Sequence, residues 1–139
     1  MRVMGRCLLA LAFFCSGPAL AYVEPDKVQN FEHVPVPAKV GKPLPPSDVR
    51  DSILWAATAK NWKIDYLGAG RLTGKLTVRD RHMIEVMISY TPQEYSIRYR
   101  DSLNMNFNPK EGTIHPNYNV WVRELRQAID QALKKAAAS

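Results

Sequence analysis

Between residues 72 and 99 the sequence alternates apolar and polar side chains in three runs, which short polar turns separate. A period of two places every second side chain on the same face of a β-strand, whereas an α-helix repeats about every 3.6 residues. We expect the inward residues to be Leu72, Gly74, Leu76 and Val78, then Ile84, Val86, Ile88 and Tyr90, and finally Tyr95, Ile97 and Tyr99. The pattern predicts an antiparallel meander with one buried face.

Two helical patterns flank this meander. The first covers residues 48–60, and we expect Ser47 or Asp48 to cap it directly after two prolines. The second begins near residue 117, where Asn117 or Asn119 is the expected N-cap and Pro116 suits the first turn. Its predicted apolar stripe consists of Trp121, Leu125, Ala128, Ile129, Ala132 and Leu133.

The buried face of the meander needs a cover, and the two helices supply it. A further short strand is expected where Trp62, Ile64 and Tyr66 alternate with polar residues. The fold class predicted is therefore α+β, a two-layer sandwich in which two helices cover one face of a three- to four-stranded antiparallel sheet. The expected order is α-β-β-β-α after a proline-rich lead, and residues 47–139 form the domain.

Residues 22–46 form this lead, which carries six of the ten prolines. Each proline fixes its own φ and biases the preceding residue toward extended backbone. Two interpretations remain open, namely an edge strand around residues 33–40 or a disordered tether.

Residues 1–21 have the features of a secretory signal peptide. Arg2 and Arg6 precede a short apolar run over residues 7–15, and Ala19-Leu20-Ala21 supplies small residues before a cleavage point. We expect cleavage near Ala21 and a periplasmic or secreted product with no membrane-spanning segment. Both cysteines lie in this segment, so residues 22–139 contain no thiol for catalysis or metal binding.

The charge of the chain bears on its partners. Loss of Arg2 and Arg6 with the signal peptide reduces the net charge from +6 to +4. Such an excess is compatible with an envelope protein, a lipid head group or a glycan as partner, and export argues against nucleic acid. The outward side of the sheet is the expected partner surface, with Lys75, Arg79, Met83, Met87, Arg98 and Arg100 on it.

A second candidate site combines the end of the last strand with the start of the last helix. Its predicted ligand-binding residues are Tyr99, Asp101, Ser102, Asn104, His115, Asn117 and Tyr118. A helix N-terminus presents free backbone donors that hold anions. The competing interpretation is structural, because helix capping and anchoring explain every one of the helix-start residues except His115.

Catalytic and metal sites have weaker support. Asp101, Ser102 and His115 contain the residue types of a hydrolase, but no Gly-x-Ser-x-Gly nucleophile turn is present. No histidine pair has metal-ligand spacing, so neither a metal nor another cofactor is expected. Met83, Met87 and Met105 leave open a copper(I) site, since thioethers are soft ligands.

Two stretches, "YSIRYRDSLNMNF" and "IHPNYNVWVREL", resemble an uncharacterised family of small exported proteins and lipoproteins of Gram-negative bacteria. The matching positions are Tyr95, Ser96, Ile97, Tyr99, Asp101 and Ser102, then Ile114, His115, Asn117, Tyr118, Asn119 and Trp121. The resemblance implies an envelope location but no reaction. Many members carry a lipid anchor, from which this chain departs because Phe13-Phe14 precede Cys15. The sequence as a whole favours a non-catalytic binding or accessory module of the cell envelope.

Overall fold

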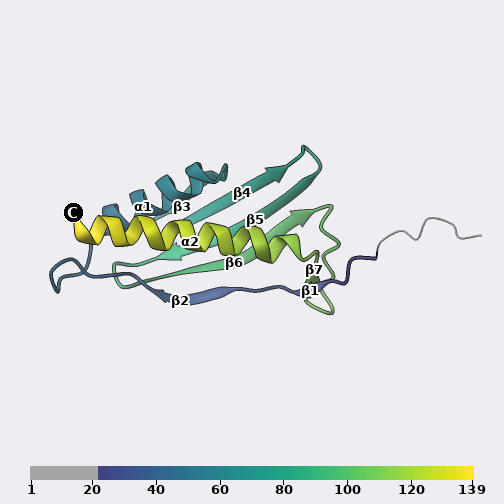
Figure 1. Ribbon diagram of the computed structural model, residues 1–139, viewed down its shortest axis with the longest axis horizontal. Helices are drawn as coiled ribbons and strands as arrows, with labels where there is room; N and C mark the ends of the chain where they lie inside the picture. The colour runs from purple at the N-terminus through teal and green to yellow at the C-terminus, as the bar shows by residue number, and fades with distance from the viewer. Residues whose placement is uncertain (1–21) are drawn as a thin grey trace, which may run out of the picture.

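A five-stranded antiparallel sheet forms one layer of the protein and two helices form the other (Figure 1). The computed structural model describes residues 22–139, and the signal peptide expected over residues 1–21 lies outside them. The elements in chain order are β1 (Asp26–Lys27), β2 (Phe31–Pro35), α1 (Pro46–Ala59), β3 (Lys63–Gly68), β4 (Arg71–Val78), β5 (His82–Tyr90), β6 (Glu94–Leu103), β7 (Thr113–Ile114) and α2 (Asn117–Ala138).

The sheet has the order β2-β6-β5-β4-β3, so four consecutive strands form a meander and the lead segment adds the fifth strand. The predicted α+β class and the antiparallel meander are confirmed. The predicted number of three to four strands is too low, because β2 pairs antiparallel with β6. Strands β1 and β7 form a separate two-stranded pair near the start of α2.

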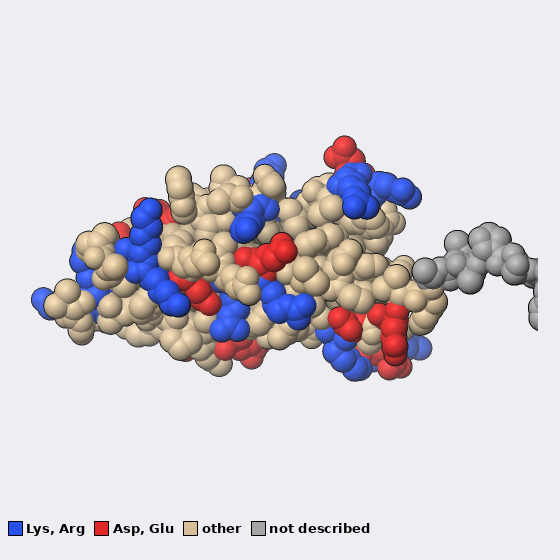
Figure 2. Space-filling model, in the orientation of Figure 1, with Lys and Arg blue, Asp and Glu red and all other residues tan. Residues whose placement is uncertain are grey.

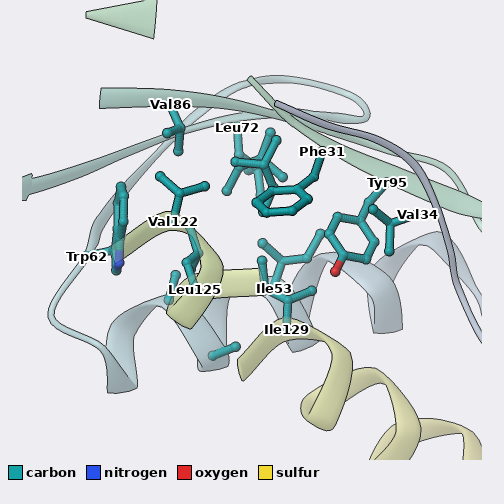
Figure 3. Packing of buried hydrophobic residues seen from close by; sticks show 14 of the residues in the cluster. Phe31, Val34, Ile53, Trp62, Leu72, Val86, Tyr95, Val122, Leu125 and Ile129 are labelled. Atoms are coloured by element: carbon teal, nitrogen blue, oxygen red, sulfur yellow. The ribbon is translucent and has the colours of Figure 1, made fainter. Parts of the chain in front are cut away.

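The hydrophobic core lies between the sheet and the two helices (Figure 3). Leu72, Ile84, Val86 and Ile88 of the meander are buried, as their alternation predicts. Trp62 packs over Gly74, where an added Cβ would lie 3.3 Å from the indole ring. A side chain at position 74 would therefore require Trp62 to shift by a few tenths of an ångström.

Helix α1 begins two residues earlier than predicted. Its first residue is Pro46, its N-cap is Pro45, and no side chain caps it. Ser47 and Asp48 therefore lie inside the first turn and are not caps. Proline is suited to the first helical position, because the N–H that it lacks would have no partner within the helix there. Leu54, which follows the buried Ile53, is exposed.

Helix α2 buries Leu125, Ile129 and Leu133 of its predicted stripe, as expected, but its buried face also includes a residue outside that stripe. Val122 is fully buried, whereas Trp121 is only half-buried. The buried residues of α2 are Tyr118, Asn119, Val122, Leu125, Ile129 and Leu133. Neither Asn117 nor Asn119 caps the helix, since the N-cap position is Pro116.

The lead segment is an ordered part of the sheet over residues 31–35, which decides between the edge strand and the tether. The edge strand is Phe31–Pro35. It starts two residues before the start of the predicted range, and it ends five residues before the end of that range. Phe31 and Val34 reach the core (Figure 3). The guanidinium of Arg126 lies 4.8 Å from the centre of the Phe31 ring, a cation–π contact that joins α2 to β2.

Side-chain amides and hydroxyls, in addition to strand pairing, hold the backbone of the lead. The Asn119 side chain accepts a hydrogen bond from the Gln29 N–H at 3.0 Å and donates one to the Lys27 carbonyl at 2.8 Å. The Ser96 hydroxyl accepts the N–H of His33, a residue with a φ of 54° at an irregularity in the β2–β6 pairing. Polar partners thus replace strand pairing where the lead is irregular.

Two exposed ion pairs also tie β2 to β6. Arg98 donates to Glu32 at 2.7 Å, and this hydrogen bond lowers the pKa of the Glu32 carboxyl below 4.5. His33 donates to Glu94 at 2.9 Å, and this hydrogen bond raises the pKa of His33 above 6.5. Exposed pairs of this kind contribute little to stability, so the buried side chains hold the strand.

We expect Asn119→Ala to lower the free energy of unfolding by about 1–3 kcal/mol, because it leaves two lead-segment backbone groups without partners. Asn117→Ala, two residues earlier on an exposed position, is the matched control and should change it by less than about 0.5 kcal/mol. Denaturant unfolding of both variants measures the difference. Equal stability of the two variants would show that the Asn119 amide does not hold the lead.

Candidate functional site

Three of the predicted site residues, Tyr99, Ser102 and Tyr118, meet beneath the first turn of α2. The hydroxyls of Tyr99 and Ser102 share a hydrogen bond of 2.9 Å. The ring of Tyr118 stands edge-on to the ring of Tyr99, with 5.6 Å between the centroids. Phe107 stacks on the ring of Tyr99 at a centroid distance of 4.3 Å. These contacts close the space between the sheet and the following loop.

A β-bulge in β6 brings Tyr99 and Ser102 to one face. Val86 is opposite Tyr99 and Glu85 is opposite Asp101, so Arg100 has no residue opposite it. The extra residue reverses the alternation, because a bulge shifts all later side chains by one position. Asn30 of the lead supports the bulge, since its side chain accepts the N–H of Tyr99 at 2.9 Å.

The Tyr118 hydroxyl is buried and is the one such side-chain group without a hydrogen-bond partner among residues 22–139. Burial raises the pKa of Tyr118, and it also raises the pKa of Tyr99. Both phenols therefore keep their protons at neutral pH, and neither provides a general base.

His115 contributes to the start of α2. Its imidazole Nδ1 accepts a hydrogen bond from the backbone N–H of Asn117 at 3.1 Å. The backbone N–H of His115 donates to the Met105 carbonyl at 2.8 Å. The imidazole thus takes one of the free backbone donors of the helix N-terminus, the role usually filled by a cap residue.

The other predicted site residues lie apart from this cluster. Asp101 faces outward after the bulge and accepts the N–H of Ser102 at 2.8 Å. The side-chain amide of Asn104 donates a hydrogen bond to the Arg81 backbone carbonyl. The backbone carbonyl of Asn104 accepts one from the imidazole Nδ1 of His82 at 2.9 Å. No hydrogen bond joins Asp101 to His115 in residues 22–139, so the hydrolase arrangement is not assembled there.

A shallow polar pocket of about 220 Å³ lies between the β4–β5 turn and α2. Its lining residues are Val78, Arg79, His82, Asn117 and Trp121. Pattern analysis missed the contribution of His82 and Trp121, because the register of β5 alone does not show which helix turn faces the hairpin.

The predicted partner surface on the outer face of the sheet is open, and its arginines have internal partners. Arg98 pairs with Glu32 at 2.7 Å, and Arg100 lies 4.0 Å from Glu85. Lys75 is exposed on the same face. Arg79 lies at the hairpin tip with a φ of 56°, beyond the flat part of the surface.

The three methionines do not form a common site. Met105 belongs to the hydrophobic core, whereas Met83 and Met87 lie half-buried on the outer face of β5. The latter two are four residues apart, which is about 13 Å along a strand. In the described part of the chain no group of three or more His, Cys, Asp or Glu residues is placed to hold a metal ion.

The solvent side of α1 carries an apolar surface that the sequence analysis did not single out. Trp55 is 74% exposed, and Leu54 and Tyr66 are also exposed. The signal was present, because the consecutive apolar residues 53–55 spread over more than half of a helical turn and cannot all face one core. Tyr66, expected inward, is exposed because β3 is the edge strand beside α1.

The charges on the face that carries α2 are mixed. Figure 2 shows Lys and Arg side chains interspersed with Asp and Glu, without an extended area of one sign. No helix within residues 22–139 is long and apolar enough to cross a membrane. Comparisons with protein-family models, with curated proteins and with solved structures gave no match to this chain.

We expect Tyr118→Phe to leave the free energy of unfolding unchanged or to raise it, because a buried hydroxyl without a partner costs about 1–3 kcal/mol. Tyr95→Phe is the matched comparison, since the Tyr95 hydroxyl donates to Asp130 and its loss should cost roughly 1–3 kcal/mol. Thermal and denaturant unfolding of both variants tests this pair. A loss of stability in Tyr118→Phe as large as that in Tyr95→Phe would mean that the Tyr118 hydroxyl has a bound partner in solution.

Proposed function

We propose that this chain is a non-catalytic binding module of the cell envelope, which binds an envelope protein through the outer face of its sheet. The proposed export rests on the signal-peptide pattern of residues 1–21. The proposed binding role rests on the outer face, which no element within residues 22–139 covers, although both helices pack on the opposite side (Figure 3).

One observation on this face carries the proposal. Lys63 and Lys75 are directly opposite each other on β3 and β4, and both are exposed. Like charges at directly opposed positions destabilise a sheet. Neither lysine has an ion pair among the described residues, and Glu85, directly opposite Lys75 on β5, lies 4.0 Å from Arg100. A carboxylate on a partner would neutralise this pair.

The charge balance favours a protein partner over a membrane or an acidic glycan. The charged residues on this face are the basic Lys63, Arg71, Lys75, Arg98 and Arg100 and the acidic Glu32, Asp65, Glu85 and Asp101. Near-equal numbers of both signs give little long-range attraction to an anionic surface. They suit a partner with a complementary pattern, since complementary charges give specificity and register.

A hydrolytic site at Asp101, Ser102 and His115 has no comparable support. The side chains of Asp101 and His115 each accept a hydrogen bond from the backbone N–H of a near neighbour in sequence. Among residues 22–139 the one side-chain partner of the Ser102 hydroxyl is the phenol of Tyr99, which burial keeps protonated.

The test is position-specific photo-crosslinking of the exported chain in a Gram-negative cell envelope. A photoreactive phenylalanine derivative at position 77, exposed on the same face of β4 as Lys75, should give a discrete protein adduct, and the same group at the exposed helix position 124 should not. Lys63→Glu in the position-77 chain should reduce the adduct yield about tenfold or more, because it places a carboxylate where the partner's carboxylate would sit.

Folding controls accompany this test. Lys63→Glu should unfold at or slightly above the temperature of the unchanged chain, since it replaces one exposed side chain and removes a destabilising like-charge pair. Equal adduct yields at positions 77 and 124, or an adduct at 77 that is indifferent to Lys63→Glu, would contradict binding through the outer face.

A further inference from the structure

A groove runs between the solvent sides of α1 and α2, on the opposite side of the molecule from the outer sheet face. Its volume is about 510 Å³. The lining residues are Asp48, Asp51, Ser52 and Trp55 from α1, and Ala132, Lys135, Ala136 and Ser139 from α2. No element in residues 22–139 fills it.

The shape and composition of the groove suit an aromatic side chain from outside. Ala132 and Ala136 are one helical turn apart on α2, so the surface between them is low and apolar. Trp55 stands on the facing helix with 74% of its surface exposed. Tryptophan is the residue type most enriched in binding hot spots and is rarely left in water.

The two walls of the groove carry opposite charges. The α1 wall has Asp48 and Asp51, and the α2 wall has Lys135. Asp51 already pairs with Arg50 at 2.9 Å, whereas Asp48 and Lys135 have no ion pair among the described residues. A surface with one acidic wall and one basic wall is complementary to a copy of itself after a twofold rotation, which exchanges the walls.

We propose that this groove is the interface of a homodimer. A twofold axis along the groove sets Asp48 of each copy against Lys135 of the other. It also places each Trp55 on the Ala132–Ala136 surface of the second copy. The interface is isologous, so every favourable contact occurs twice.

Other surfaces of the chain are less suited to self-association. The β2 edge of the sheet ends in Pro35 and has an irregular register, and the β3 edge has a register shift at Leu67. Proline and bulges at sheet edges prevent further strand pairing. A membrane is disfavoured as occupant of the groove, because Asp48 and Asp51 repel anionic lipid.

Sedimentation equilibrium of the chain 22–139, from micromolar to millimolar concentration, tests the dimer. The unchanged chain should show a monomer–dimer equilibrium. Trp55→Ser should weaken dimerisation at least about tenfold while the unfolding temperature stays the same, because Trp55 is exposed in the monomer. Leu103→Ser, which removes another exposed apolar residue on the outer sheet face, should leave the dimer unchanged.

A charge exchange makes the test specific for the proposed geometry. Asp48→Lys and Lys135→Asp should each weaken the dimer several-fold, and the double variant should restore it, since the charges are then exchanged across the interface. A chain that remains monomeric at all concentrations would overturn the proposal, as would a double variant weaker than both single variants. Monomers that bind phosphatidylglycerol vesicles in a Trp55-dependent manner would replace the second copy with a membrane.

Discussion

The rest of the structure depends on the packing and hydrogen bonding of the lead segment against β6 and α2. Asn119, buried in the first turn of α2, binds the backbone of Lys27 and Gln29, which precede it by about ninety residues in the chain. Phe31 then enters the core beneath the guanidinium of Arg126. Because α2 is held at the sheet partly through these contacts, we expect the lead, the last helix and the core to unfold as one cooperative unit.

The same contacts of the lead segment determine how the polar side chains at the end of β6 are oriented. Asn30 accepts the N–H of Tyr99 at the bulge in β6, and the bulge turns Asp101 outward and Ser102 inward. The residues with the appearance of a catalytic group in the sequence thereby point in different directions. The structure instead leaves two separate exposed surfaces on opposite sides, which suits a protein that binds and assembles.

The sequence predicts those parts of the fold that repeat locally. The meander and both helices follow from period-two and helical patterns. The repeat within a single strand or helix determines which of its side chains face inward, as for Ile84 and Ile129. The sequence left strand β2 open between an edge strand and a tether, since His33 breaks its alternation and its partners lie about sixty residues away. The candidate site was predicted only in part, because one extra residue at Arg100 decides which side chains share a face.

The central claim is that the lead is an integral strand and unfolds with the core. Native-state hydrogen exchange measures it directly, because the amide groups of Gln29, His33 and Val36 are each hydrogen-bonded in the structure. The account predicts that these three amides exchange with the same free energy as the amides of β5, which is the free energy of global unfolding. Exchange of all three near the rate of an unstructured chain, while β5 stays protected, would contradict it.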